Sequence, residues 1–265
     1  MTQDERNALK RWEEHHKALA ADVPVEDWLS QSDIDRKRKK LEEDPIVWIT
    51  YFFPKYAKYE FAPFHVRAIR RIIEHDEWYE VLSWSRELAK STVAMFICMY
   101  LALTKRKKFF VLASATIDSA KRLLAPYKIN FESNPRIRQF YGSQMTLGQW
   151  TDGEFTAKCG AKFFALGAGS APRGARNEDI RPDVIYMDDF DTDEDCRNPE
   201  TLKKKWDWFE ASLYPTRSIS EPTLILWCGN IIAKDCCIRR AGEKARHWDI
   251  VNIRDKNGRS PWPAK

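Results

Sequence analysis

Residues 83–92 read SWSRELAKST and end on a lysine followed by two hydroxyl side chains. In a phosphate-binding loop of the form G-x-x-x-x-G-K-[ST], backbone N–H groups wrap a phosphate, the lysine reaches the β- and γ-phosphates, and the hydroxyl binds Mg²⁺. This chain has Trp84 and Ala89 where the two glycines would stand. A plain strand-to-helix corner is therefore the competing interpretation. The context favours the phosphate loop, because an apolar strand precedes it and an apolar helix follows it.

A second group of residues is acidic. Residues 184–187 read VIYM, which is typical of a buried strand, and Asp188 and Asp189 follow directly. Because the carboxyl ends of parallel strands line the ligand crevice, we expect Asp188 to hold Mg²⁺ and Asp189 to polarise the attacking water. For the acidic residues up to Asp195 the alternative is capping of the next helix, and the role of Asp191 stays open. Together the two motifs predict a nucleoside triphosphatase.

Apolar strands alternate with helices around these motifs. We expect strands at 79–84, 107–115, 154–160, 161–168, 183–189 and 222–230. We expect helices at 63–74, 90–104, 117–132 and 199–213. Such alternation predicts an α/β fold with a mostly parallel sheet flanked by helices, and with 154–168 as an inserted hairpin. Residues 1–44 predict an N-terminal helical extension, 45–256 the ATPase domain and 257–265 a linker.

Composition sets limits on the class of protein. Of the 265 residues 43% are hydrophobic, and the net charge of +5 permits an anionic partner without requiring one. The six cysteines include no C-x-x-C pair, which argues against a zinc site or a disulfide framework. The longest apolar run, 93–103, is well short of the roughly 20 residues that span a bilayer. We therefore expect a soluble, intracellular protein without membrane contact.

Several stretches, in this order, resemble the N-terminal ATPase domain of the large terminase subunit of tailed bacteriophages, the DNA-packaging motor. SRELAKST at 85–92 is similar to the family's variant Walker A motif, in which an arginine stands early in the loop. GAGSAPRGARNEDIRPDVIYMDDFD at 167–191 resembles its Arg-Gly segment running into the Walker B strand. PTLILWCGN at 222–230 resembles the strand that carries the coupling motif. The resemblance covers residues 45–262 and implies an α/β fold of the RecA/ASCE-like P-loop NTPase class.

The resemblance implies particular roles for particular residues. The nucleotide-binding residues would be Ser85, Arg86, Glu87, Leu88, Ala89, Lys90, Ser91 and Thr92, with His65 in the adenine-binding segment. The metal ligands would be Ser91 and Asp188, and the coupling motif would be Gly229 and Asn230. The catalytic residues would be Asp189, Arg86 at the γ-phosphate, and Arg173 or Arg176 as an arginine finger. For either finger arginine the alternative is a surface position or a salt bridge. Phe61 or Phe64, near His65, could stack on the base, and for them the alternative is core packing.

What the resemblance implies for function is an ATPase that uses ATP and Mg²⁺ to move double-stranded DNA into a procapsid in the host-cell cytoplasm. Its implied partners are a portal protein, the small terminase subunit and further copies in a homo-oligomeric ring. Nuclease activity is not expected, because the family's nuclease domain would follow residues 257–265. Candidate DNA contacts are Lys121, Arg122, Lys128, Arg136, Arg138 and the basic cluster 36–40. A helicase-like DNA-remodelling ATPase and a non-catalytic nucleotide-binding module remain the alternatives.

Overall fold

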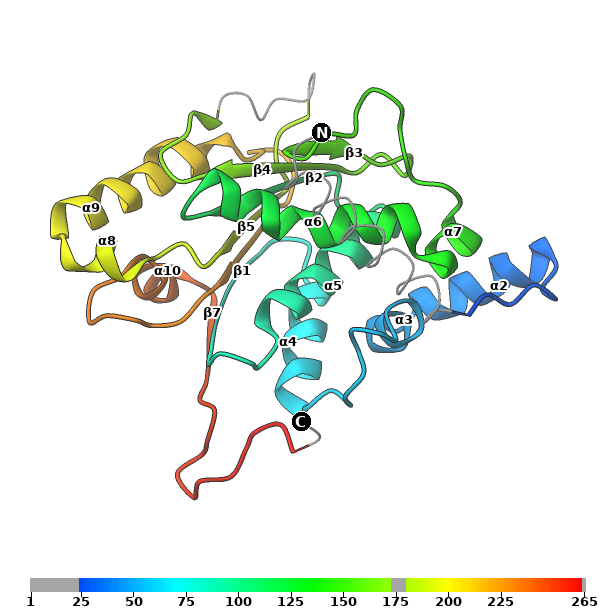
Figure 1. The fold of residues 1–265 in the computed structure, drawn as a ribbon, viewed down its shortest axis with the longest axis horizontal. Coiled ribbons are helices and arrows are strands. Elements are labelled where there is room, and N and C mark those ends of the chain that lie inside the picture. The colour runs from blue at the N-terminus through cyan, green and yellow to red at the C-terminus, as the bar shows by residue number, and fades with distance from the viewer. Residues whose placement is uncertain (1–23, 173–179, 264–265) are drawn as a thin grey trace, which may run out of the picture.

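A seven-stranded sheet forms the centre of the computed structural model, which describes residues 24–172 and 180–263 (Figure 1). The strands are β1 (Trp78–Trp84), β2 (Phe109–Ser114), β3 (Glu154–Thr156), β4 (Lys162–Gly167), β5 (Val184–Asp188), β6 (Leu224–Cys228) and β7 (His247–Val251). Their order is β3-β4-β2-β5-β6-β1-β7, and every neighbouring pair is parallel except β3 with β4. The mostly parallel sheet and the inserted β3–β4 hairpin are as predicted.

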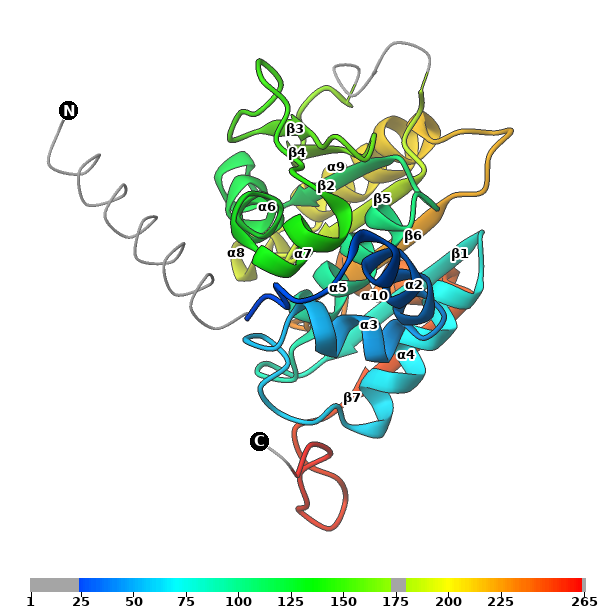
Figure 2. The same ribbon diagram turned by 90° about the vertical axis from the view of Figure 1, so that its right-hand side faces the viewer.

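Helices cover both faces of the sheet (Figure 1). One face carries α3 (Pro45–Phe52), α4 (Pro63–Glu74), α5 (Lys90–Leu103), α6 (Ile117–Ser133) and α7 (Pro135–Tyr141), with α2 (Gln31–Glu42) packed on α3 and α7. The other face carries α8 (Asp193–Arg197), α9 (Pro199–Trp208), a π-helical turn (Phe209–Leu213), a 3₁₀ turn (Tyr214–Thr216) and α10 (Cys237–Lys244). In Figure 2, α2, α3 and α7 lie together on the side that faces the viewer.

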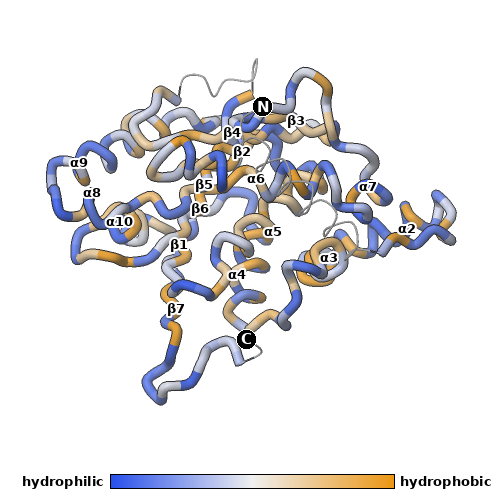
Figure 3. Tube along the Cα trace, in the orientation of Figure 1, coloured by the Kyte–Doolittle hydropathy of each residue, from blue (hydrophilic) through white to orange (hydrophobic). Residues whose placement is uncertain are grey.

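Side chains on the central strands alternate between two hydrophobic cores. On β2, Phe110 and Leu112 face the α4–α6 side, whereas Phe109 and Val111 face α9 and α10. All residues of β2, β5 and β6 are buried, as the near-continuous apolar runs of a doubly covered parallel sheet require. Helix α5 is apolar nearly all round because it lies between α4, α6 and the sheet (Figure 3). The cores thus fix the strands whose ends carry the polar motifs.

Helix α4 has the bounds and the buried face that its period predicts. Pro63 stands at its first turn, and Phe64, Ala68, Ile69 and Ile72 are all buried. Proline suits this position because its missing N–H would be unpaired there anyway. An apolar stripe of this kind is what attaches a surface helix to a core.

Several elements differ from the sequence prediction. Helices α3, α7 and α10 and strand β7 were not predicted, the 199–213 helix becomes π-helical at Phe209, and the 154–160 strand ends at Thr156. The stretch PIVWITYF of α3 is apolar on all sides, so it shows no 3.6-residue period to read. Strand β7 is a short edge strand with Asp249 at its centre and lacks a long apolar run. The division at residues 44 and 256 stays a prediction, and residues 1–23 lie outside the described part.

No helix within the described ranges combines the length and the apolarity that crossing a bilayer would require.

Candidate functional site

Three parallel strands end at the same level and open on one cleft. Leu82 of β1 and Asp188 of β5 both pair with Cys228 of β6, so the loops that follow these strands leave one edge of the sheet. The cleft at this edge has a volume of about 530 Å³. Among its lining residues are five of the predicted site residues: Arg86, Lys90, Asp189, Gly229 and Asn230. The register therefore brings together motifs that lie far apart in the sequence.

The loop between β1 and α5 adopts two left-handed residues without glycine. Glu87 has φ 69° and Ala89 has φ 59°. Ala89 is also the N-cap of α5 and offers no side-chain cap, which leaves the first N–H groups of the helix to other acceptors. Alternation of right- and left-handed residues turns successive N–H groups towards one concave side, the arrangement that holds anions in phosphate loops. The two left-handed residues are compatible with the phosphate loop predicted at 84–91, although both glycine positions are substituted.

Left-handed backbone has an energetic cost for residues with a Cβ atom, about 1 kcal/mol or more for each such residue. Alanine carries the smallest side chain that can occupy this conformation after glycine, and Glu87 turns its side chain out to solvent. The loop therefore keeps its shape against a local preference, and contacts from neighbouring elements must hold it there.

Lys90 and Asp188 lie at the closed end of the site. The Lys90 side chain is almost fully buried at the start of α5, and the Lys90 carbonyl accepts a hydrogen bond from the Cys228 thiol. Asp188 is 6% exposed, and in the described structure its buried Oδ1 has no hydrogen-bond partner. Burial, and secondly the charge of Asp189, raise the pKa of Asp188 to about 7, against the opposing effects of Ser91, Tyr186 and Lys90.

These oxygens suit a magnesium ion. Mg²⁺ prefers carboxylate, hydroxyl and water oxygens, and it usually binds one or two carboxylates together with substrate phosphates. The unpartnered Asp188 oxygen and the Ser91 hydroxyl, which lowers the pKa of this carboxyl, are such donors. A bound cation would also offset the cost of burying the ionised carboxylate. Ser91 and Asp188 therefore fit the predicted metal.

Asp189 and Asp191 have different environments. Asp189 follows β5 with φ 42°, is exposed, and lines the cleft, while its N–H donates to the Cys228 carbonyl at 3.1 Å. The two carboxylate oxygens of Asp191 instead accept from the Cys237 and Ile238 amides at 2.9 Å and so cap α10. Since both Asp191 oxygens are engaged, Asp189 is the better placed of the two to contact a water molecule. The capping predicted as the alternative also holds for Asp195, which accepts from Thr192 and Lys205.

Gly229 and Asn230 join the cleft to α10. The Gly229 amide donates to the Leu82 carbonyl at 3.3 Å, which ties the end of β6 to β1. A Cβ at Gly229 would lie 2.8 Å from Cδ1 of Ile238, so glycine allows α10 to pack directly on this turn. Asn230 follows, half-buried, in the wall of the cleft.

The structure places His65 behind the phosphate loop and not among the residues that line the cleft. Its ring is fully buried, its Nδ1 accepts from the Ala62 amide at 3.1 Å, and its Nε2 lies 3.0 Å from the Leu88 carbonyl. Both ring nitrogens are thus engaged with backbone groups and neither is directed at a base. Phe64 is buried as well, the core position that was its alternative.

Other predicted residues are engaged elsewhere or lie outside the described part. Arg173 and Arg176 belong to the latter group. Arg136, a candidate DNA contact, donates to the Pro24 and Tyr51 carbonyls, and Lys128 pairs with Asp152 at 2.9 Å. In the cluster 36–40, Lys37 pairs with Glu26, and Arg36 and Arg38 pair with aspartates of their own helix. The exposed candidates are Arg36, Lys39, Lys40, Lys121, Arg122 and Arg138.

Several contributors to the cleft were missed from the sequence. Ala115, in the turn after β2, and Ser119, in the first turn of α6, are two of them. Thr116 caps α6 by accepting from the Ser119 amide at 3.1 Å. The spacing of Thr116 and Ser119 after an apolar strand is a helix-start signal that could have indicated this turn.

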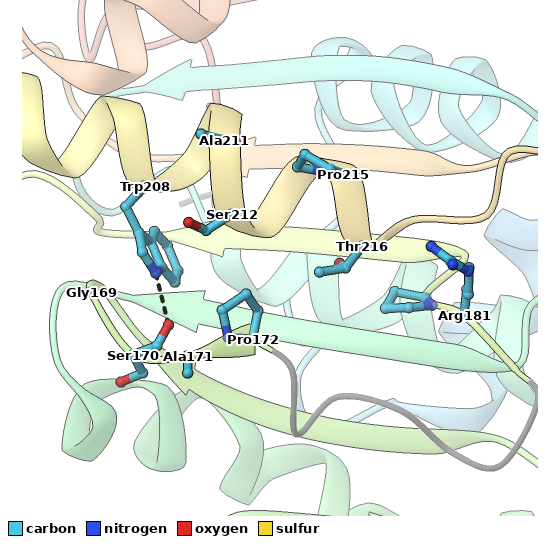
Figure 4. Close-up of a pocket in the computed structure, with 11 residues that line it drawn as sticks. Gly169, Ser170, Ala171, Pro172, Arg181, Trp208, Ala211, Ser212, Pro215 and Thr216 are labelled. Carbon is cyan, nitrogen blue, oxygen red and sulfur yellow. Dashed lines mark hydrogen bonds between the residues drawn. The ribbon is translucent and has the colours of Figure 1, made fainter.

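A second cleft, of about 460 Å³, lies between the turn after β4 and the π-helical turn (Figure 4). The Trp208 indole donates to the Ser170 carbonyl across it at 2.8 Å. Arg181 is the one charged residue among the described residues that line it. It shares no lining residue with the first cleft, and it lacks a pair of titratable groups that could perform acid–base chemistry.

Comparisons with known proteins found solved structures of low similarity. No family model matches the chain, and no curated protein sequence matches it. A large terminase ATPase domain from Thermus phage P74-26 is similar over 68% of this chain and 68% of that one, at 15% identity and a TM-score of 0.45. A DEAD box protein from Methanococcus jannaschii is similar over 79% and 53%, at 11% identity and a TM-score of 0.45. The N-terminal domain of the DNA packaging ATPase from bacteriophage phi29 is similar over 62% and 78%, at 13% identity and a TM-score of 0.39. At these TM-scores the likenesses do not indicate a function. The functional proposal for this chain rests on its cleft.

The left-handed conformation of Ala89 predicts how substitutions there act. For Ala89→Gly we expect a free energy of unfolding within about 1 kcal/mol of the parent protein, because relief of the backbone strain is offset by the greater freedom of glycine in the unfolded chain. For Ala89→Val we expect a loss of more than about 1 kcal/mol, since a β-branched residue tolerates this conformation poorly. Urea unfolding measures both. The control is Ala211→Val, at an exposed helical position. If Ala89→Val were as stable as the parent protein, the left-handed conformation of residue 89 would be contradicted.

The raised pKa of Asp188 predicts a pH-dependent response to magnesium. The folded pKa of about 7 lies above the unfolded value of 3.8, so from this group alone the free energy of unfolding falls as the pH rises through that interval. Mg²⁺ binds the ionised form, and we expect it to raise Tm more at pH 8 than at pH 6. In Asp188→Asn the difference between the two pH values should vanish. If Mg²⁺ raised the Tm of the parent protein equally at both pH values, the magnesium site at Asp188 would be refuted.

Proposed function

We propose that this chain is the ATP-hydrolysing motor domain of a DNA-packaging terminase, which couples hydrolysis to the movement of double-stranded DNA into a procapsid. The observation that carries the proposal is the convergence, at one sheet edge, of a left-handed loop ending in Lys90, the acidic pair Asp188-Asp189 and the Gly229-Asn230 turn. The order of the sequence motifs that resemble the terminase family supports this class over other P-loop ATPases.

Each residue of the site has a separate role in phosphoryl transfer. Backbone N–H groups of the loop and the Lys90 ammonium bind the phosphates. Ser91 and Asp188 would hold Mg²⁺, which would supply positive charge next to the phosphates. Asp189 accepts a hydrogen bond from the attacking water and orients it towards the γ-phosphorus. Its carboxylate suits this task because it is exposed to the cleft and has no hydrogen-bond partner among the described residues. Arg86, exposed on the same cleft, contacts the γ-phosphate.

Coupling passes from the cleft to α10. The Gly229 turn packs on Ile238, and Asp191 binds the first amides of the same helix. Arg86 and the turn after β5, which holds Asp189 and Asp191, both face the γ-phosphate. When the γ-phosphate is lost, this turn shifts, and α10 moves with it because Asp191 binds the first amides of that helix. An arginine finger, Arg173 or Arg176, would add its charge at the γ-phosphate from this chain or from a neighbouring copy in a ring.

The remaining parts of the proposal come from the family resemblance. They are ATP as the nucleotide, double-stranded DNA as the cargo, the portal protein and small terminase subunit as partners, and the host-cell cytoplasm as the location. The helicase-like alternative is supported by Ala115 in the cleft wall, since it belongs to the stretch Ser114-Ala115-Thr116 and a Ser-Ala-Thr stretch at a strand end also occurs as a helicase motif. Separation of DNA strands by the purified protein would favour that alternative, and ATP-driven movement along intact duplex would favour packaging.

Substitution of the loop lysine tests the nucleotide site. In Lys90→Ala we expect ATP hydrolysis to fall by about 10²-fold or more, because a preorganised positive charge at the phosphates is lost. Steady-state phosphate release with and without duplex DNA measures the effect. Lys203→Ala, on the exposed side of α9, is the matched control and should retain activity. A Lys90→Ala protein that hydrolyses ATP at the parent rate would exclude this site.

Salt dependence tests the contact with DNA. Binding through phosphates without reading of bases predicts that affinity for duplexes of unrelated sequence falls linearly, on logarithmic axes, with salt concentration. The slope of log affinity against log salt concentration counts phosphate contacts. Replacing a lysine that contacts a phosphate by alanine, here Lys39 or Lys40, should reduce that slope by about 1. Fluorescence anisotropy of a labelled duplex measures it, with Arg136→Ala, engaged within the fold, as the comparison. Affinity that does not change with salt would contradict a backbone contact.

A further inference from the structure

The phosphate loop carries strain at two positions on either side of one residue. Glu87 and Ala89 are both left-handed, and Leu88 lies between them with its side chain buried. Strained backbone of this kind persists only where its surroundings determine it. The contacts made by the Leu88 carbonyl and by the start of the loop therefore decide whether the binding conformation is populated before a nucleotide arrives.

His65 holds the Leu88 carbonyl from behind. Because the His65 Nδ1 accepts from the Ala62 amide, the ring proton is on Nε2, which donates to the Leu88 oxygen at 3.0 Å. Burial lowers the pKa of His65, so the ring is neutral and the tautomer is set by these two contacts. A fixed donor on a buried ring is a rigid support for one carbonyl of the loop.

The ring of His65 is in turn held by a residue near the end of the chain. The Trp262 and His65 ring centroids are 4.5 Å apart, with an interplanar angle of 77°. Trp262 is 8% exposed, and its indole N–H donates to the Glu60 carbonyl at 2.7 Å. In Figure 1 the red segment after β7 returns to the beginning of α4, where His65 lies. Trp262 thus closes one side of the pocket that encloses the imidazole.

The same C-terminal segment also binds the first residue of the loop. The Ser85 amide donates to the Val251 carbonyl at 2.9 Å, and the Ile253 amide donates to the Ser85 hydroxyl at 3.1 Å. The segment 251–262, here called the C-terminal brace, therefore contacts the loop at Ser85 directly and at Leu88 through His65. These contacts lie on both sides of Arg86 and Glu87.

We propose that the C-terminal brace holds the phosphate loop in its binding conformation, with His65 and Trp262 as positioning residues, so that nucleotide affinity depends on how Trp262 packs. Glycines would let such a loop adopt left-handed backbone without help, and here external contacts take their place. The inference rests on the proposed nucleotide site and adds a means of control: displacement of Trp262 releases His65, then Leu88, and weakens nucleotide binding.

Paired substitutions separate positioning from general stability. Glutamine can present its amide nitrogen where the His65 Nε2 lies, whereas asparagine, one methylene shorter, cannot reach the Leu88 carbonyl. The variants are His65→Gln, His65→Asn, Trp262→Phe and Trp262→Ala. Ile253→Ala is the control, because this exposed side chain lies in the brace but only its backbone binds Ser85. Hydrogen exchange of peptides covering 85–92 and 184–188 is measured without nucleotide, followed by titration with a fluorescent ATP analogue and Mg²⁺.

For His65→Asn and Trp262→Ala we expect amide exchange in 85–92 to rise about tenfold while exchange in 184–188 is unchanged, and analogue affinity to fall about five- to tenfold. His65→Gln, Trp262→Phe and Ile253→Ala should stay within about twofold of the parent protein. Equal exchange in 85–92 for His65→Asn and His65→Gln, or a uniform rise that includes 184–188, would overturn the proposal. A parent protein that binds no analogue would instead reject the nucleotide site, and the exchange result would still report on the brace.

Discussion

The parallel register of β1, β6 and β5 is the constraint from which the site follows. It aligns Leu82, Cys228 and Asp188 at one level, so that the turns after the three strands open together. The helix after β1 contributes Lys90, the turn after β5 contributes Asp189, and the turn after β6 contributes Asn230. Hydrophobic side chains on both faces of the strands hold this register, because a shift by one residue would turn each face of the sheet inside out. The core thus determines which polar groups meet.

Two features of the site oppose folding and point to the same ligand. Asp188 is buried with one oxygen lacking a partner, and the loop at Glu87 and Ala89 has left-handed backbone. A cation at Asp188 would supply the missing partner, and a phosphate at the loop amides would offset the cost of the left-handed backbone. Before any ligand binds, the loop depends on neighbouring elements for its shape, and the C-terminal brace supplies those contacts from behind. Stability and ligand binding are therefore linked at this edge of the sheet.

Much of this arrangement could be predicted from local patterns. The buried strands β2, β5 and β6 are short apolar runs ended by turns, and α4 shows a regular apolar stripe, so their positions were predicted to within a few residues. That the loop after β1 and the acidic residues after β5 lie at the same edge of the sheet followed from the rule that ligands bind at the carboxyl ends of parallel strands. Strand β7 was missed because it is a short edge strand with Asp249 at its centre, which interrupts the apolar run.

Other features depend on contacts between distant residues and have no local signal. A histidine in an aromatic stretch gives no indication that its ring will support a carbonyl at Leu88, or that Trp262 will pack against it. Likewise, nothing in the acidic run distinguishes Asp189, exposed on the cleft, from Asp191, which caps α10. The left-handed backbone of Ala89 also runs against its residue type, because alanine prefers other conformations. Tertiary packing decided each of these.

A crystal structure of the protein with Mg²⁺ and a non-hydrolysable ATP analogue tests the central claim most directly. The account predicts phosphate density at the backbone amides of residues 86–90 and a metal ion between the Ser91 hydroxyl and the Asp188 carboxylate. It also predicts that His65 remains bound to the Leu88 carbonyl, as in the structure described above. Density for the analogue in another cleft, such as the one between Ser170 and Trp208, with the loop at 84–91 empty, would contradict it.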